Sequence, residues 1–249
     1  MSCESHSGYS ITSGQRPLAF KFTPMPWHRP RTLEVQAAYA LWAATYAPLA
    51  HNPLMAAEQA ALEAMLLPLG ASRALDIGTG SGRCRPLLAQ TGAAQIVGLD
   101  FSMPMLSHNH SSAWLLCAEA QRLPLPATSF DLALASLVAG HLPDLVSWVK
   151  ETWRVLRPGG QLLYSDFHPD GAKAGWQRTF KTAGGQVFAV RHYARPIPEQ
   201  YAALSANGFT VQEVCEPRLG QQPDPQVEAF HRRWGDPPVV VIFRAMKVD

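Results

Sequence analysis

The chain has 249 residues, of which 47% are hydrophobic, and it carries 21 Lys and Arg against 19 Asp and Glu. This length and composition predict one large folded domain and exclude a disordered tail protein. A net charge of +2 is too small for a nucleic-acid-binding surface, so we expect no nucleic-acid partner.

Two further classes of protein are disfavoured. No stretch approaches the roughly 18 consecutive apolar residues of a membrane-spanning helix. The first residues, MSCESHSGYS, lack the charged and then apolar layout of a secretory signal, so we expect a cytoplasmic protein. The four cysteines form no CxxC pair, and His108 and His110 lack a third ligand at metal-site spacing, so no metal site is expected.

The N-terminal part of the chain predicts an arm followed by two helices. Residues 1–31 are rich in Ser, Gly and Pro and read as a loosely ordered arm. Thr32 to Ala47 carries an aromatic stripe at helical spacing, and Leu54 to Leu67 is a second helix that ends at Pro68. We interpret 32–70 as a helical cap at the start of a single domain over 32–249.

Short apolar runs separated by helix-sized segments follow at 74–77, 95–99, 130–135 and 160–165. This alternation is typical of βαβ units and predicts an α/β fold: a doubly wound, Rossmann-like, mostly parallel sheet with helices on both faces. Leu145 to Leu156 is the clearest covering helix. The chain then continues with a hairpin from 177–181 and 186–190 inside an insertion at 171–197, a helix at 198–207, and strands at 209–214 and 239–245.

The most informative segment is Asp76-Ile77-Gly78-Thr79-Gly80-Ser81-Gly82, which follows a strand and opens a helix. Closely spaced glycines in this context let a ligand approach the backbone. The spacing does not fit the GxGxxG of dinucleotide-binding loops. Asp76 would also repel a pyrophosphate, whereas it would attract a cationic group.

Two more acidic positions fit the same ligand. Asp100 ends the next strand, about 20 residues after the loop, where a carboxylate can accept from both hydroxyls of a ribose. Glu119 and Ala120 precede the strand at 130–135, and a carboxylate there could accept from an adenine amino group. Each acid alone is more often a solvated loop residue or a helix cap. Together they indicate a nucleoside ligand with a cationic end.

The series LDIGTGSG, VGLDFSMPML, AEAQRLPLPATSFDLALAS and VLRPGGQLLYSDF resembles the motifs of class I S-adenosylmethionine-dependent methyltransferases. The similarity is to the branch with the ubiquinone, menaquinone and malonyl-carrier-protein methyltransferases, and it runs from about Ala74 to Phe167. It implies a seven-stranded sheet with an antiparallel last strand, and S-adenosyl-L-methionine as cofactor. It also implies that Asp76 faces the methionine amino group, Gly78, Gly80 and Gly82 the methionine backbone, Asp100 the ribose, Phe101 and Met105 the adenine faces, and Glu119 with Ala120 the adenine edge.

We add Tyr46, Thr79 and Ser136 to the expected cofactor-binding residues. Tyr39, Trp42 and Tyr46 could close over the methionine end of the cofactor, or they could form a packing stripe. His141 and His168 follow the strands at 130–135 and 160–165, where reacting groups gather, and an imidazole suits general-base duty. The alternative for each is a helix-capping or polar loop histidine.

The acceptor is expected to be a small molecule. The insertion carries Lys173, Arg178, Lys181, Arg191 and Arg195 without an acidic residue. This charge favours an anionic acceptor such as a carboxylate, a phosphorylated metabolite or a group on an acidic carrier protein, although a solvated hairpin explains it equally well. The competing hypothesis is a noncatalytic S-adenosylmethionine-binding protein, or one that uses the cofactor for another reaction.

Overall fold

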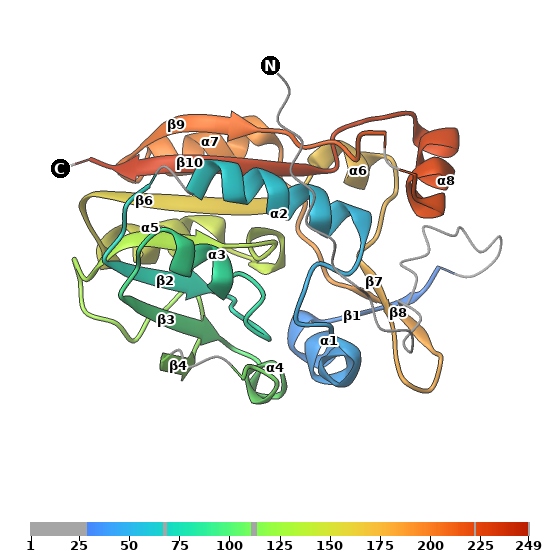
Figure 1. Ribbon diagram of the computed structural model, residues 1–249, viewed down its shortest axis with the longest axis horizontal. Helices are drawn as coiled ribbons and strands as arrows, with labels where there is room; N and C mark the ends of the chain where they lie inside the picture. The colour runs from blue at the N-terminus through green and yellow to red at the C-terminus, as the bar shows by residue number, and fades with distance from the viewer. Residues whose placement is uncertain (1–28, 67–68, 111–113, 222, 249) are drawn as a thin grey trace, which may run out of the picture.

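The structure is a computed structural model that describes residues 29–248 except 67–68, 111–113 and 222. Most of the expected arm therefore lies outside the described residues, and its last residue, Arg31, opens a short strand. The main sheet has seven strands (Figure 1). They are β2 (Arg73–Ile77), β3 (Gln95–Asp100), β4 (Trp114–Cys117), β5 (Phe130–Ala135), β6 (Leu156–Phe167), β9 (Phe209–Cys215) and β10 (Val240–Lys247).

The strand order is β4-β3-β2-β5-β6-β10-β9. Strand β10 runs antiparallel to both of its neighbours, while the remaining pairs run parallel. The predicted seven-stranded sheet with an antiparallel last strand is thus confirmed. The chain moves outward from β2 to β4 and then returns to place β5 on the other side of β2. This reversal creates a switch point between β2 and β5, where open α/β sheets bind their ligands.

Helices cover both faces of the sheet (Figure 1). Helices α2 (Pro53–Leu66), α3 (Arg85–Gln90) and α8 (Pro225–Trp234) contribute to one apolar core, and α5 (Leu145–Val155) and α7 (Ile197–Ser205) contribute to the other. Helix α5 begins at Asp144, whose side chain accepts from the Ser147 N–H. Its stripe of Trp148, Val149 and Val155 is fully buried against the sheet. The central strands are buried on both sides, which explains why they read as unbroken apolar runs.

A second, three-stranded sheet lies beyond the carboxyl ends of β2 and β3 (Figure 1). Strand β1 (Arg31–Leu33) pairs in parallel with β8 (Val187–Val190), which forms the predicted hairpin with β7 (Thr179–Lys181). Helix α1 (Val35–Trp42) packs on this sheet, and Thr45 of the single turn η1 (Ala43–Thr45) donates to the Lys181 carbonyl at 3.4 Å. We call these elements the cap sheet and its helix. The Trp42 ring stacks on Phe180 with centroids 4.9 Å apart.

One helix boundary was predicted wrongly, and one strand was not predicted. The helix expected from Thr32 begins at Val35, because residues 31–33 are drawn into the cap sheet. Strand β4 was missed because it is short and lies at the sheet edge, where Trp114 is 69% exposed. The remaining short elements are α4 (Met103–Ser107), η2 (Ala139–His141) and α6 (Pro169–Lys173).

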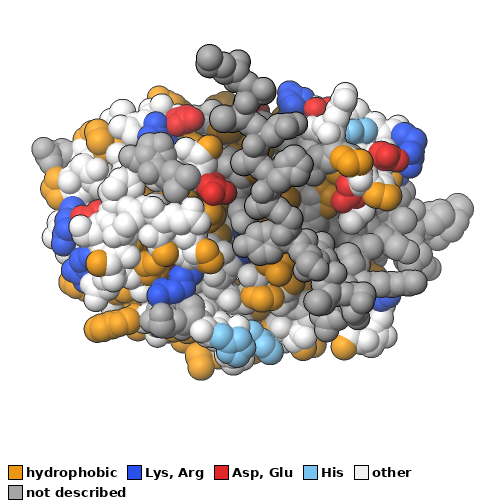
Figure 2. Space-filling model, in the orientation of Figure 1, with side chains coloured by type: hydrophobic (Ala, Val, Ile, Leu, Met, Phe, Trp, Pro, Cys, Tyr) orange, Lys and Arg blue, Asp and Glu red, His pale blue; other side chains and the backbone are white. Residues whose placement is uncertain are grey.

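On the side of the molecule seen in Figure 2, the coloured Lys and Arg side chains of the described residues lie interspersed with Asp and Glu side chains. None of the described helices is both long enough and apolar enough to span a bilayer.

Candidate functional site

A cavity of about 360 Å³ opens at the switch point between β2 and β5. Its volume lies within the range of roughly 300 to 1,000 Å³ typical of small-molecule sites. Its wall combines the loops after β2, β3, β4 and β5 with helix α1. Of the residues predicted from the sequence, it brings together Tyr46, Asp76, Gly78, Thr79, Gly80, Asp100, Phe101, Met105, Glu119, Ala120, Ser136 and His141. Gly82 and His168 do not line it.

The loop after β2 has glycine where a side chain would be strained or crowded. Gly78 has a φ of +70°, and a Cβ atom there would lie 2.3 Å from Cγ2 of Val138. Gly80 has a φ of +49°, and its Cβ would lie 3.0 Å from Cε of Met105 and 3.8 Å from Oδ2 of Asp100. Both residues therefore keep the cavity wall at the level of the backbone, which fits the close approach of a ligand.

Gly82 has a packing role. A Cβ atom there would lie 2.8 Å from Oδ1 of Asn109, whose Nδ2 donates to the Gly80 carbonyl at 3.1 Å. Asn109 therefore holds the glycine loop against the end of α4. The sequence reading missed this residue because the run His108-Asn109-His110 has the composition of an exposed loop.

Asp76 is buried at the end of β2 and accepts a hydrogen bond of 2.7 Å from the Thr79 hydroxyl. Burial raises the pKa of Asp76 to about 6, while the Thr79 hydrogen bond and the positive charge of Arg83 oppose this rise. A cationic ligand group would compensate the desolvated carboxylate.

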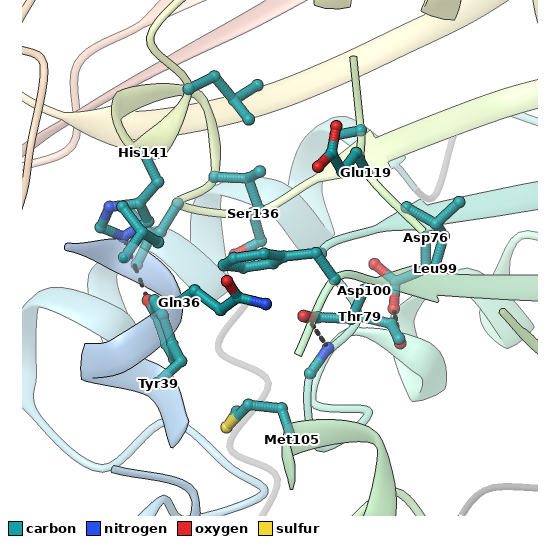
Figure 3. A pocket seen from close by; sticks show the side chains of 18 of the residues that line it. Gln36, Tyr39, Asp76, Thr79, Leu99, Asp100, Met105, Glu119, Ser136 and His141 are labelled. Carbon is teal, nitrogen blue, oxygen red and sulfur yellow. Dashed lines mark hydrogen bonds between the residues drawn. The ribbon is translucent and has the colours of Figure 1, made fainter. Parts of the chain in front are cut away.

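Asp100 and Glu119 lie on the adjoining strand ends. Oδ2 of Asp100 accepts from the Gly80 N–H at 2.9 Å, and Oδ1 accepts from the Ser102 N–H at 2.8 Å. A carboxylate accepts about four hydrogen bonds, so Asp100 keeps capacity to accept from a ligand hydroxyl group. Burial raises the pKa of Asp100, and these backbone hydrogen bonds lower it. Figure 3 shows Glu119 on the same cavity as Asp76 and Asp100.

Ser136 belongs to a buried polar network under the cavity. Its Oγ lies 2.5 Å from Oε1 of Glu58 and 2.5 Å from Nη2 of Arg83. Oε1 of Glu58 also accepts from the Ser165 hydroxyl at 2.5 Å, and Oε2 accepts from Arg83 Nη2 at 2.8 Å. Glu58 is fully buried on α2. The Ser136 hydroxyl is thus engaged by the protein, and Glu58 is a site residue that its helix pattern did not reveal.

His141 and Tyr39 face each other on the opposite side of the cavity, and Gln36 of α1 points toward its centre (Figure 3). Nδ1 of His141 lies 3.0 Å from the Arg191 carbonyl, which can only accept, so Nδ1 carries the proton. The lone pair on Nε2 then faces two donors, the Tyr39 hydroxyl at 3.1 Å and Nη1 of Arg178 at 2.9 Å. Burial and the charge of Arg178 hold the pKa of His141 well below its ordinary value.

Among the five basic residues of the insertion, Arg178 is the one that lines this cavity. Its guanidinium lies 5.3–5.7 Å from the ring centroids of Tyr39, Trp42 and Phe167, and it donates to the Leu137 carbonyl at 3.1 Å. It is 7% exposed, and no acidic side chain pairs with it among the described residues. Arg191, by contrast, pairs with Glu34 at 2.8 Å.

His168 lies elsewhere. It lines a second cavity of about 290 Å³ and its Nε2 is 2.8 Å from Oε2 of Glu216. Its side chain also accepts from the Asp170 N–H at the start of α6. The structure therefore brings one of the two predicted histidines to the cavity that holds the acidic residues.

The sequence of the cavity-forming region matches a known family model. Residues 75–164 match the model described as a methyltransferase domain. The demethylmenaquinone methyltransferase of Thermus thermophilus is 32% identical over 164 residues, a match that covers 56% of this chain and 74% of that protein. The chain belongs to the S-adenosylmethionine-dependent methyltransferase family. The cofactor of this family is S-adenosyl-L-methionine.

A further curated relative and a solved structure show how much of this methyltransferase is similar to known proteins. The 27-O-demethylrifamycin SV methyltransferase of Amycolatopsis mediterranei is 32% identical over 139 residues, or 50% of this chain and 51% of that protein. The chain thus spans about half the length of this curated relative. A solved S-adenosylmethionine-dependent methyltransferase from Mesorhizobium loti is 25% identical, with a TM-score of 0.60 over 79% of this chain and all of that chain.

Proposed function

We propose that this methyltransferase transfers a methyl group from S-adenosyl-L-methionine to a small-molecule acceptor that carries a negative charge. The observation that carries the proposal is the cavity itself. It joins three carboxylates on successive strand ends, Asp76, Asp100 and Glu119, to a cationic and aromatic wall on its other side.

The cofactor side is assigned by charge and by available hydrogen-bond capacity. We assign the methionine amino group to Asp76, the ribose hydroxyls to Asp100 and the adenine edge to Glu119 with Ala120. Met105 and Phe101 would contact the adenine faces, and Gly78, Thr79 and Gly80 would follow the methionine backbone. Tyr46 would close the methionine end. The bound cofactor supplies a methyl group already activated by a sulfonium, so the protein mainly has to align an in-line displacement.

The acceptor side is assigned by the charge of Arg178. A guanidinium that is withdrawn from water without a carboxylate partner is costly, and an anion in the cavity would offset that cost. Helix α1 and the β7–β8 hairpin bring Tyr39 and Arg178 together at this end. A free carboxylate or phosphate and an acidic group presented on a carrier protein offer the same chemistry to Arg178, so the proposal covers both.

His141 as a general base stays a prediction, and its contacts support a different role. Its one available lone pair already faces Tyr39 and Arg178, and its low pKa makes it a weak base. We propose that His141 positions these two side chains, and that the acceptor enters the cavity already ionised.

The test is transfer of a labelled methyl group from S-adenosyl-L-methionine to a panel of acceptors offered in matched pairs. Each pair contains a carboxylic acid and its amide, and one series is loaded on an acyl carrier protein. The proposal expects labelled product from the acids, and expects Arg178→Gln to raise the KM of the acids while the amides, offered as competitors, inhibit the variant and the unmodified protein alike. Binding of S-adenosylhomocysteine with no labelled product from any acceptor would instead favour a noncatalytic cofactor-binding protein.

A further inference from the structure

The methionine end of the cofactor is a zwitterion, with an ammonium and a carboxylate on the same carbon atom. Asp76 can compensate the ammonium, but the carboxylate needs hydrogen-bond donors of its own within the same small region. The glycine loop supplies backbone N–H groups, yet those of Gly78, Gly80 and Gly82 already donate to the Leu99 carbonyl, the Asp100 carboxylate and the Thr79 carbonyl. These three N–H groups are thus already used within the protein, which favours a side-chain donor for the carboxylate.

Arg83 follows this loop directly and lines the cavity. The positive charge of Arg83 lowers the pKa of the Asp76 carboxyl, against the effect of burial. The side chain of Arg83 is 8% exposed. Arg83 therefore shares a cavity with Asp76, the proposed ammonium site, and is shielded from water, where a charge-assisted hydrogen bond is strong.

The donors of Arg83 are only partly used by the protein. Nη2 contacts Glu58 at 2.8 Å and Ser136 at 2.5 Å. Nη1 is buried and has no hydrogen-bond partner within the described part of the chain. A buried, unsatisfied guanidinium nitrogen at a cavity wall is unusual in a folded protein, and a ligand oxygen is one way to satisfy it.

The Glu58 network explains how Arg83 would be held for this purpose. Glu58 is fixed by two serine hydroxyls at 2.5 Å, from the ends of β5 and β6, so it anchors Nη2 from below the cavity. A guanidinium with one nitrogen anchored presents its remaining donors in a fixed plane. From this geometry we infer that Arg83 binds the carboxylate of the methionine part of S-adenosyl-L-methionine, with Glu58 and Ser136 positioning it. The inference rests on the proposed cofactor site.

The test compares two ligands that differ only in this carboxylate. S-adenosylhomocysteine and its decarboxylated analogue, which keeps the amino group, are titrated by calorimetry into the full chain. In the unmodified protein, loss of the carboxylate should weaken binding about 10- to 100-fold. In Arg83→Gln the same change in the ligand should weaken binding less than about threefold, because the partner of the carboxylate is gone.

Arg178→Gln is the matched control, because it removes the other arginine of the cavity and should leave the ratio of the two affinities unchanged. The double variant Glu58→Gln, Arg83→Gln removes both charges of the buried pair, so it serves if the single variant fails to fold. In this variant too, the affinities for the two ligands should differ by less than about threefold. The inference is overturned if the ratio survives in these Arg83 variants, or if Arg178→Gln abolishes it. Failure of the unmodified protein to bind either ligand would instead overturn the proposed cofactor site.

Discussion

The hydroxyl of Tyr39 lies 3.1 Å from Nε2 of His141, although 102 positions separate the two residues in the sequence. Tyr39 belongs to the helix of the cap sheet, and His141 belongs to the turn after β5. The rings also meet edge to face, with centroids 5.5 Å apart. One wall of the cavity comes from the cap and another comes from the main sheet, and this contact links the two.

Replacement of His141 should separate cofactor binding from turnover. In His141→Ala we expect the affinity for S-adenosylhomocysteine to stay within about threefold, because His141 lies across the cavity from the three carboxylates. Methyl transfer should slow by about tenfold or more, since Tyr39 and Arg178 each lose a charge-assisted or buried hydrogen bond. Calorimetry and a labelled-methyl assay measure the two effects. Full activity in this variant would rule out a role for His141.

The affinity for the cofactor product should depend on pH through Asp76. Burial raises the pKa of Asp76 to about 6, and only the ionised form can pair with an ammonium. Binding should therefore weaken by about tenfold for each pH unit below about 6 and should level off above about 7. Calorimetry between pH 5 and 8 provides the profile.

The control for this profile is Asp76→Asn, which should bind weakly at all these pH values and lose the slope. Stability of the free protein should move in the opposite direction. Because the pKa of Asp76 is raised in the folded state, the free energy of unfolding attributable to this group falls as the pH rises from about 4 to about 6 and is constant above that. An unchanged slope in the variant would assign the pH dependence to another group.

Gly78 should tolerate alanine poorly, because the added Cβ atom would clash with Val138. Gly159, which has a similar φ, separates this clash from the backbone strain. Gly78 and Gly159 have φ values of +70° and +73°, but a Cβ atom would meet Val138 at the first position and nothing within 4 Å at the second. We expect Gly159→Ala to cost about 1 kcal/mol, and Gly78→Ala to cost more and to weaken cofactor binding. Chemical denaturation measures both. Equal losses would mean that the contact with Val138 relaxes without cost.

Glu58 should be a major determinant of stability. Glu58→Ala leaves Arg83 buried without its carboxylate, and loss of one partner of a buried pair typically costs about 3 to 5 kcal/mol. Glu63→Ala removes a carboxylate from the same helix and serves as the control, with an expected effect within about 0.5 kcal/mol. Urea unfolding distinguishes the two. A loss under about 1 kcal/mol in Glu58→Ala would show that the network contributes little.

Much of the main sheet and of the cofactor side could be predicted because its signals are local. The runs that became β2, β3, β5 and β6 are largely apolar, and Asp76 and Asp100 lie at the carboxyl ends of β2 and β3. Asp76 and Asp100 could therefore be placed at one edge without knowing any long-range contact. The edge strand β4 lacks such burial, so its four residues carry no distinctive pattern.

The acceptor side could not be predicted in the same way, because it is assembled from distant segments. The run of basic residues pointed to the insertion, but nothing in the spacing separated Arg178, which lines the cavity, from Arg195, which donates to the carbonyls of Ala139 and Leu142. Glu58 was hidden for a similar reason. Its partners Ser136 and Ser165 lie 78 and 107 positions away, so its helix reads as an ordinary amphipathic one.

The parallel pairing of β1 with β8 has an evolutionary consequence. The stretch before α1 and the hairpin near residue 185 are hydrogen-bonded to each other, with Thr32 opposite Ala189, so neither can be remodelled alone without breaking the ladder between them. Changes of substrate in this lineage should accordingly appear as correlated exchanges in these two segments. The glycine loop and the strand tips beside it would stay constant through the same exchanges.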